Sequence, residues 1–167
     1  MKKIFLFHFL LLSLFMFSQA SDSITIKFPA KYNLELKNNQ KNDSQILKEW
    51  IPKKETFENY SIIATQLVIK NGVDIPFDLF KDKMIDDMKN KTINFKYTEL
   101  QRADNSLIFK CEADSYKDNN EKESQIYFLT KGKKNFIINI VALKQSSLSK
   151  EFTDEWLKVF NDSRSVE

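Results

Sequence analysis

Histidine and cysteine are almost absent from this sequence, which contains one residue of each type in 167 positions. The histidine is His8, inside an N-terminal segment that we expect to be removed, and the cysteine is Cys111. A mature chain without imidazole excludes histidine-assisted nucleophiles, histidine-ligated zinc and imidazole proton shuttles. A single cysteine forms no intrachain disulfide. We therefore expect a protein that is not an enzyme and that binds no metal and no cofactor.

Glycine and proline are also scarce, with two and three residues, which excludes flexible linkers and low-complexity segments. Hydrophobic residues make up 42% of the chain and charged residues 29%, a balance that is typical of a folded domain and not of a disordered tail. The length suits one core of ordinary domain size. We predict a single α+β domain over residues 21–167.

The N-terminus has the features of an export signal. Lys2 and Lys3 precede an apolar run over residues 4–12, and small residues at Ser18 and Ala20 match the positions that a signal peptidase reads. The run is shorter than the roughly 20 apolar residues that span a bilayer. We predict a signal peptide over residues 1–20, cleavage after Ala20, and an exported protein that is periplasmic or extracellular. An uncleaved membrane anchor is the alternative.

Removal of the signal also changes the charge. The whole chain carries a formal net charge of +3, and loss of Lys2 and Lys3 lowers it to +1 because residues 1–20 contain no acid. A nearly neutral domain lacks the strongly basic face that nucleic-acid binding requires. We therefore expect no nucleic-acid partner.

The first half of the domain indicates strands separated by turns. Alternating apolar residues predict strands over residues 24–28, 32–36, 44–51 and 62–69, and the polar segment 38–43 predicts a turn. Thr56 is suited to cap a short helix over residues 56–62, with Glu58 near the positive end of its dipole. After a break at Asn71, Pro76 precedes a second, amphipathic helix of about 14 residues. Its apolar face contains Phe77, Phe80, Met84, Ile85 and Met88.

Residues 92–143 alternate with period two between turn signals, which predicts a four-stranded antiparallel meander. Its last strand, residues 135–143, is apolar on both faces, so both faces should be covered. In an earlier strand Cys111 alternates with polar neighbours, which predicts a buried, unreactive thiol. Residues 148–160 predict an amphipathic helix capped by Ser147 or Ser149. The expected fold is α+β, an antiparallel sheet, mainly a C-terminal meander, with helices covering both faces.

Two compact lysine clusters fall on predicted loops. One contains Lys53 and Lys54, and the other contains Lys131, Lys133 and Lys134. Together with exposed aromatic residues, such clusters suit contact with phosphate groups of a lipid surface or with an anionic glycan. Chance clustering in a lysine-rich chain is the alternative explanation.

The stretch WIPKKETFENY, residues 50–60, resembles a W/Y-x-P-x-x-E-T-x-E-N-aromatic pattern that opens the first helix of small exported bacterial proteins. Tyr60 stands where that pattern has tryptophan. The order of a long helix, antiparallel strands and a Trp-containing terminal helix also resembles this group, over most of the mature chain. Its fold is PsbP-like, an antiparallel sheet between helices. The resemblance implies a non-enzymatic envelope or accessory role, with no catalytic residues to transfer.

The sequence favours an exported, non-catalytic bacterial protein that recognises a protein partner or a small ligand. Trp50 and Tyr60 are its candidate binding residues, and core packing is the alternative role for Trp50. A second hypothesis is a peripheral protein, such as a secreted effector, that binds anionic lipid head groups through the two lysine clusters. A third is a hydrolase that uses carboxylates such as Glu55 and Glu58, which requires both to face one cleft.

Overall fold

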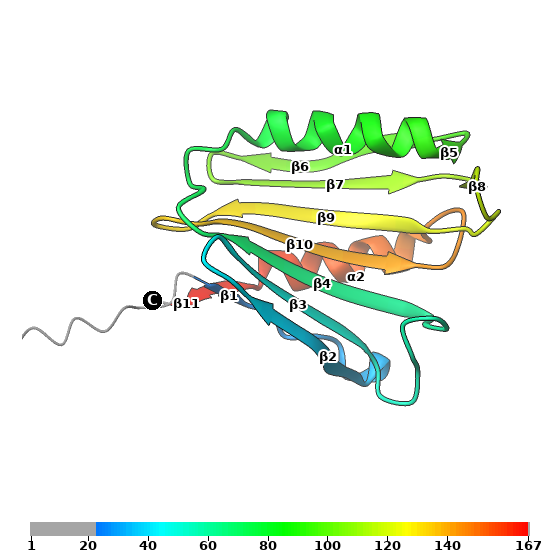
Figure 1. The fold of residues 1–167 in the computed structure, drawn as a ribbon, viewed down its shortest axis with the longest axis horizontal. Helices are drawn as coiled ribbons and strands as arrows, with labels where there is room; N and C mark the ends of the chain where they lie inside the picture. Colours follow the sequence, from blue (N-terminus) through cyan, green and yellow to red (C-terminus); the bar gives the residue numbers. More distant parts are fainter. Residues whose placement is uncertain (1–22, 167) are drawn as a thin grey trace, which may run out of the picture.

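The main sheet contains seven antiparallel strands (Figure 1). The computed structural model describes residues 23–166, so the predicted signal peptide and its cleavage site at Ala20 lie outside the described residues. The strands are β2 (Leu34–Lys41), β3 (Gln45–Pro52), β4 (Ile62–Ile69), β6 (Lys96–Ala103), β7 (Ser106–Glu112), β9 (Ser124–Lys131) and β10 (Phe136–Leu143). They are hydrogen-bonded in the order β2-β3-β4-β10-β9-β7-β6, which confirms the α+β class and the C-terminal meander.

Helix α1 (Phe77–Lys91) confirms the amphipathic helix expected after Pro76. Proline suits this position because the first amides of a helix have no partner within it. Phe77, Phe80 and Met84 face a group of residues that we call the α1-side cluster. Its buried members are Phe77, Leu107, Phe109, Cys111, Tyr127, Leu129, Phe136 and Ile138. Figure 1 shows α1 running along β6 and β7.

Helix α2 (Lys150–Asn161) confirms the predicted terminal helix. Its N-cap is Ser149, whose Oγ accepts a hydrogen bond of 3.1 Å from the Phe152 amide. Phe152, Trp156 and Phe160 are buried in a second group, the α2-side cluster. The other buried members are Ile24, Ile62, Ala64, Val68, Ile108, Ile126, Phe128, Ile137, Val141 and Leu148. Figure 1 shows α2 behind β9 and β10.

Strand β10 lies between β4 and β9 and is buried on both faces, as its sequence predicts. Ile137 and Val141 belong to the α2-side cluster, whereas Phe136 and Ile138 belong to the α1-side cluster. This division follows from the strand itself, because successive side chains point to opposite faces. Full burial stabilises the fold by about 1.5–3 kcal/mol for each such side chain. Strand β10 therefore forms the centre of the core.

Two short ladders lie outside the main sheet. Strand β1 (Ser23–Thr25) pairs with β11 (Arg164–Val166), and β5 (Thr92–Ile93) pairs with β8 (Ser115–Tyr116). The predicted strand over residues 24–28 is therefore too long, because Ile26 and Phe28 leave the ladder and pack on the α2-side cluster. The period-two pattern that begins at residue 92 does not form one continuous strand, because Asn94 has a left-handed φ of 53° that is incompatible with a strand.

The predicted helix over residues 56–62 is wrong. Residues 53–61 form a loop between β3 and β4, which we call the 53–61 loop. The Thr56 carbonyl accepts a hydrogen bond of 3.1 Å from the Asn59 amide, which is a turn contact and not a helical one. From Ile62 onward the chain pairs with β10 and β3, where β-branched side chains pack well.

The predicted turn over residues 38–43 is too long. Asn38 and the next three residues continue β2, and their register partners lie on β3. Polar residues are tolerated there because β2 is an edge strand of the sheet, where side chains meet solvent. The turn begins at Asn42, whose Oδ1 accepts hydrogen bonds from the amides of Ser44 and Gln45 at 2.9 and 2.8 Å.

Candidate functional site

The 53–61 loop is closed by contacts within itself. The Glu55 carboxylate accepts hydrogen bonds from the Ser61 amide at 2.6 Å and from the Ser61 hydroxyl at 2.8 Å. Between these two residues, the side chain of Phe57 is 41% exposed. The loop therefore exposes the Phe57 ring to solvent on a backbone that the hydrogen bonds between Glu55 and Ser61 hold closed.

Tyr60 anchors the same loop to the sheet. Its hydroxyl donates a hydrogen bond of 2.5 Å to Glu123 Oε2, directly before β9. Burial raises the pKa of Tyr60 well above its ordinary value, and the hydrogen bond to Glu123 adds to the rise. The Nζ of Lys144 lies 4.7 Å from the centroid of the Tyr60 ring and donates to the Glu58 carbonyl at 3.3 Å. Tyr60 is thus a protonated donor in a fixed position.

The second oxygen of Glu123 is engaged as well. Gln125 Nε2 donates to Glu123 Oε1 at 2.5 Å, and the Tyr127 hydroxyl donates to Gln125 Oε1. The Glu123 carboxylate thus accepts one hydrogen bond from Tyr60 and one from Gln125, and Gln125 in turn accepts one from Tyr127. Because both oxygens of Glu123 already accept a hydrogen bond, this arrangement is suited to anchoring the loop.

Trp50 lies at the edge of the core. Its ring centroid is 5.2 Å from that of Phe28 in an edge-on arrangement, and the side chain packs against the α2-side cluster. Lys53 and Lys54, which follow β3 directly, are exposed. The two lysines and Phe57 therefore belong to the accessible part of the predicted binding segment, and Trp50 is half-buried against the α2-side cluster.

The second lysine cluster begins at Lys131, the last residue of β9, and continues into the connection to β10. Lys133 and Lys134 are exposed, and Lys131 Nζ lies 5.3 Å from the centroid of the Phe77 ring. This connection adjoins the end of β4 at Ile69, whereas the 53–61 loop adjoins its start at Ile62. An eight-residue strand spans about 23 Å. The structure thus places the two lysine clusters at opposite ends of the strands and does not bring them together.

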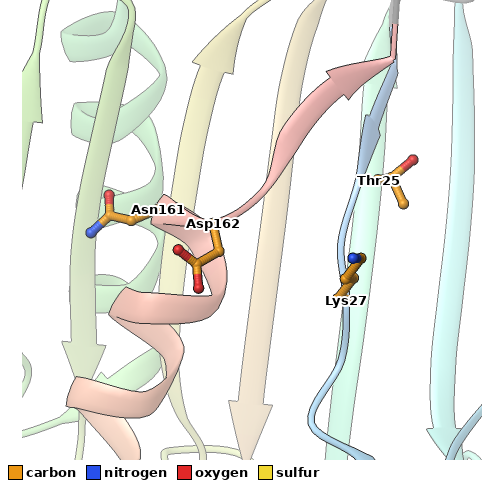
Figure 2. Close-up of a pocket in the computed structure, with 4 residues that line it drawn as sticks. All are labelled: Thr25, Lys27, Asn161 and Asp162. Carbon is orange, nitrogen blue, oxygen red and sulfur yellow. The ribbon is translucent and has the colours of Figure 1, made fainter.

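A pocket of about 590 Å³ opens between residues 25–27, at and after the end of β1, and the C-terminal end of α2 (Figure 2). Thr25 and Lys27 line one wall, and Asn161 and Asp162 line the other. The Asn161 amide is engaged by Gln101 in two reciprocal hydrogen bonds of 3.1 Å. In Figure 2 the Asp162 carboxylate points away from Lys27. All four lining residues are exposed, so the pocket is a polar hollow open to solvent.

The only cysteine, Cys111, is buried in the α1-side cluster, as predicted. Burial raises the pKa of its thiol to about 12, so the reactive thiolate is scarce at neutral pH. Among residues 23–166, no group of three His, Cys, Asp or Glu side chains is placed to hold a metal ion. Within the same range, no helix has the length and apolar character needed to cross a bilayer.

Comparison with known proteins found no matching family model, no matching curated protein and no matching solved structure. Phe57, Glu123 and Lys144 are the important residues that the sequence interpretation missed. Phe57 was assigned to a helix, and the partners of Tyr60 are distant in sequence, with Glu123 63 positions away.

Proposed function

We propose that this chain is an exported, non-catalytic binding or accessory protein of a bacterial envelope or secretome, and that it recognises a protein partner through the 53–61 loop. The observation that carries the proposal is the exposure of Phe57, at 41%, on a loop closed by Glu55 and Ser61 and anchored by Tyr60. Lys53 and Lys54 are exposed on the same loop and add positive charge to it. A small ligand bound elsewhere on the domain is compatible with this role.

The physical support is pre-organisation. Binding energy at interfaces concentrates in a few residues, often aromatic, and ordering a flexible loop on binding reduces affinity. The contacts of Glu55 and Tyr60 lower that ordering cost because they hold the loop before a partner arrives. Exposed aromatic residues on fixed loops are typical of recognition surfaces.

The non-catalytic part of the proposal has its own support. His8, the only imidazole, lies in the predicted signal peptide, and Cys111 is buried. Of the two carboxylates considered for a hydrolase, Glu55 is committed to Ser61. Glu58 is exposed, and a hydrogen bond from Thr56 holds its pKa below the ordinary value, which favours a permanently charged group over a general acid.

Partner capture tests the loop surface. Immobilised protein would be mixed with envelope and secreted fractions of the cells that make it, and bound proteins would be identified by mass spectrometry. Phe57→Ala should reduce recovery of a specific partner at least tenfold, since loss of a central aromatic contact costs more than about 1.4 kcal/mol. Leu79→Ala is the matched control, because Leu79 is 65% exposed on α1. Equal recovery by both variants, with folding intact, would eliminate this surface.

Peripheral binding to anionic lipid is the second candidate function. Its support is the placement of Lys131, Lys133 and Lys134 at the end of β9 and on the short connection that follows it. Co-sedimentation with phosphatidylserine vesicles tests it, with the triple Lys→Gln variant of this connection compared with Lys53→Gln/Lys54→Gln. Binding should weaken with added salt and in the first variant, because exposed charges are screened. Binding that is insensitive to salt contradicts the candidate.

For the fold, we propose the PsbP-like arrangement, with one helix on each face of the sheet. Its support is the order of elements, from a long helix through a meander to a terminal helix that contains Trp156. The division of β10 side chains between the α1-side and α2-side clusters supports it further. An experimental structure with both helices on the same face would contradict it.

A further inference from the structure

The edge strand β2 contains a β-bulge in its middle. Leu36 lies opposite Trp50 on β3. The next β2 residue with a partner is Asn38, which lies opposite Glu49. Trp50 and Glu49 are adjacent in β3, whereas one residue separates their partners in β2. Lys37 is therefore an extra residue between two regular stretches of the ladder.

The edge strand at the other end of the sheet, β6, has the same irregularity. Glu99 lies opposite Phe109 on β7, and the next pair joins Gln101 to Ile108. Leu100 is the extra residue here, and its side chain packs against the α2-side cluster. Figure 1 shows β2 and β6 at opposite ends of the sheet, so each of its two edges carries one bulge.

Side chains at both bulges contact other parts of the fold. Lys37 Nζ donates to Glu35 Oε2 at 2.6 Å and to the Lys53 carbonyl, at the start of the 53–61 loop, at 3.2 Å. At the other edge, Gln101 Nε2 donates to Asn161 Oδ1 at the end of α2, at 3.1 Å. Redirecting a side chain is a usual role of a bulge. These contacts indicate that both bulges are integral features of the fold.

A bulge changes what an edge strand offers to another chain. A regular edge presents a row of N–H and C=O groups that a further strand can pair with. The extra residue interrupts that row and increases the local twist. The uninterrupted stretches are residues 34–36 and 38–41 of β2, and residues 96–99 and 101–103 of β6. Each is shorter than the usual strand of about 5–6 residues.

We propose that the two bulges close the edges of the main sheet to a further strand, so that the domain stays monomeric. The association that they prevent at β2 is antiparallel pairing with a second copy across a two-fold axis, which would continue the sheet from one copy into the other. The same barrier stops a partner from adding a strand to β2. This inference does not rest on recognition by the 53–61 loop, and either can fail without the other.

Two deletions repair the β2 bulge. Deletion of Lys37 leaves the pairs of Leu36 and Asn38 as they are and makes the strand regular. Deletion of Asn38 makes it regular as well and places Lys37 opposite Glu49, a pair of opposite charges. Sedimentation equilibrium of the purified proteins measures dimerisation. Both deletions should lower the dimer dissociation constant at least tenfold relative to the wild type.

Hydrogen exchange locates the contact. In the deletion variants, the β2 amides that face away from β3 should gain protection as the concentration rises, and in the wild type they should not. Lys37→Ala is the matched control, because it keeps the bulge while removing the charge and the hydrogen bond to the Lys53 carbonyl. It should stay as monomeric as the wild type.

Four results would overturn the proposal. The first is a wild-type dimer with protected β2 amides. The second is a pair of folded deletion variants that remain as monomeric as the wild type. The third is dimerisation of Lys37→Ala as strong as that of the deletions, which would assign the effect to charge. The fourth is failure of both deletion variants to fold, because a residue that is extra to the ladder should be dispensable for it.

Discussion

Tyr60 and Glu123 are 63 positions apart in the chain and are joined by a hydrogen bond of 2.5 Å from the tyrosine hydroxyl to the carboxylate. The contact fixes the 53–61 loop to the start of β9. A neutral donor on a half-buried carboxylate is a strong arrangement, because the ionised acceptor strengthens the bond. The loop is thus held by Glu123 from outside as well as by the Glu55–Ser61 contacts within it.

The first prediction concerns this anchor. Tyr60→Phe should lower the free energy of unfolding by about 1–3 kcal/mol, because it leaves a carboxylate oxygen with one donor fewer. Glu123→Ala should be similarly destabilising. In urea unfolding, the double variant should lose less than the sum of the single variants, by about 1 kcal/mol or more. Additive losses would mean that the hydrogen bond contributes nothing.

The second prediction concerns the start of α2. Ser149→Ala should lower the free energy of unfolding by about 1 kcal/mol, because the Phe152 amide loses its acceptor. Ser147→Ala is the control, since Ser147 is exposed and lies outside the cap, and surface substitutions usually stay within about 0.5 kcal/mol. Denaturant titration of both variants gives the comparison. Equal effects would remove the capping role from Ser149.

The third prediction concerns the core. Trp156 is fully buried and its ring contacts Phe28, Tyr32, Phe152 and Phe160. Trp156→Ala should destabilise the protein by about 3–5 kcal/mol, from lost burial and the cavity that remains. Circular dichroism during urea unfolding measures the change, with Lys158→Ala on the exposed side of the helix as control. A loss below about 1 kcal/mol would place this residue outside the core.

The fourth prediction concerns alkaline pH. The ordinary thiol pKa is about 8.5, and burial raises that of Cys111 to about 12 in the folded protein. The uncharged thiol therefore stabilises the fold fully below about pH 8.5, and this contribution is lost as the pH rises toward 12. Between these limits the wild type should lose more stability than Cys111→Ala. At pH 8, a thiol reagent should label Cys111 only after unfolding, and rapid labelling of folded protein would contradict its burial.

Much of the fold could be predicted because burial leaves a periodic trace in the sequence. The apolar face of α1, with Phe77, Phe80 and Met84, indicated its helix, and apolar residues on both faces of β10 indicated a central strand. The cap at Ser149 was one of two candidates that local sequence allowed. Each of these features depends on neighbours within a few residues, which sequence displays directly.

The remaining features depend on contacts that local sequence does not display. Thr56 and Glu58 are residues that suit the start of a helix, and they led to the predicted helix. In the structure, Ser61 instead donates hydrogen bonds to Glu55, and the residues from Ile62 onward join the sheet. Residues 38–41 were predicted to form a turn because they are polar, but an edge strand also tolerates polar residues. For the candidate surface, the two lysine clusters looked equivalent in sequence, and only the strand register separates them.

Site-specific photo-crosslinking tests the central claim, that the 53–61 loop recognises a protein partner, most directly. A photoreactive phenylalanine analogue would replace Phe57 in one variant and Leu79 in another, in the cells that make the protein. The account predicts one discrete adduct from position 57, lost when Lys53→Ala/Lys54→Ala is added, and no such adduct from position 79. The same pattern of adducts from both positions, or none from position 57 in folded and exported protein, would contradict it.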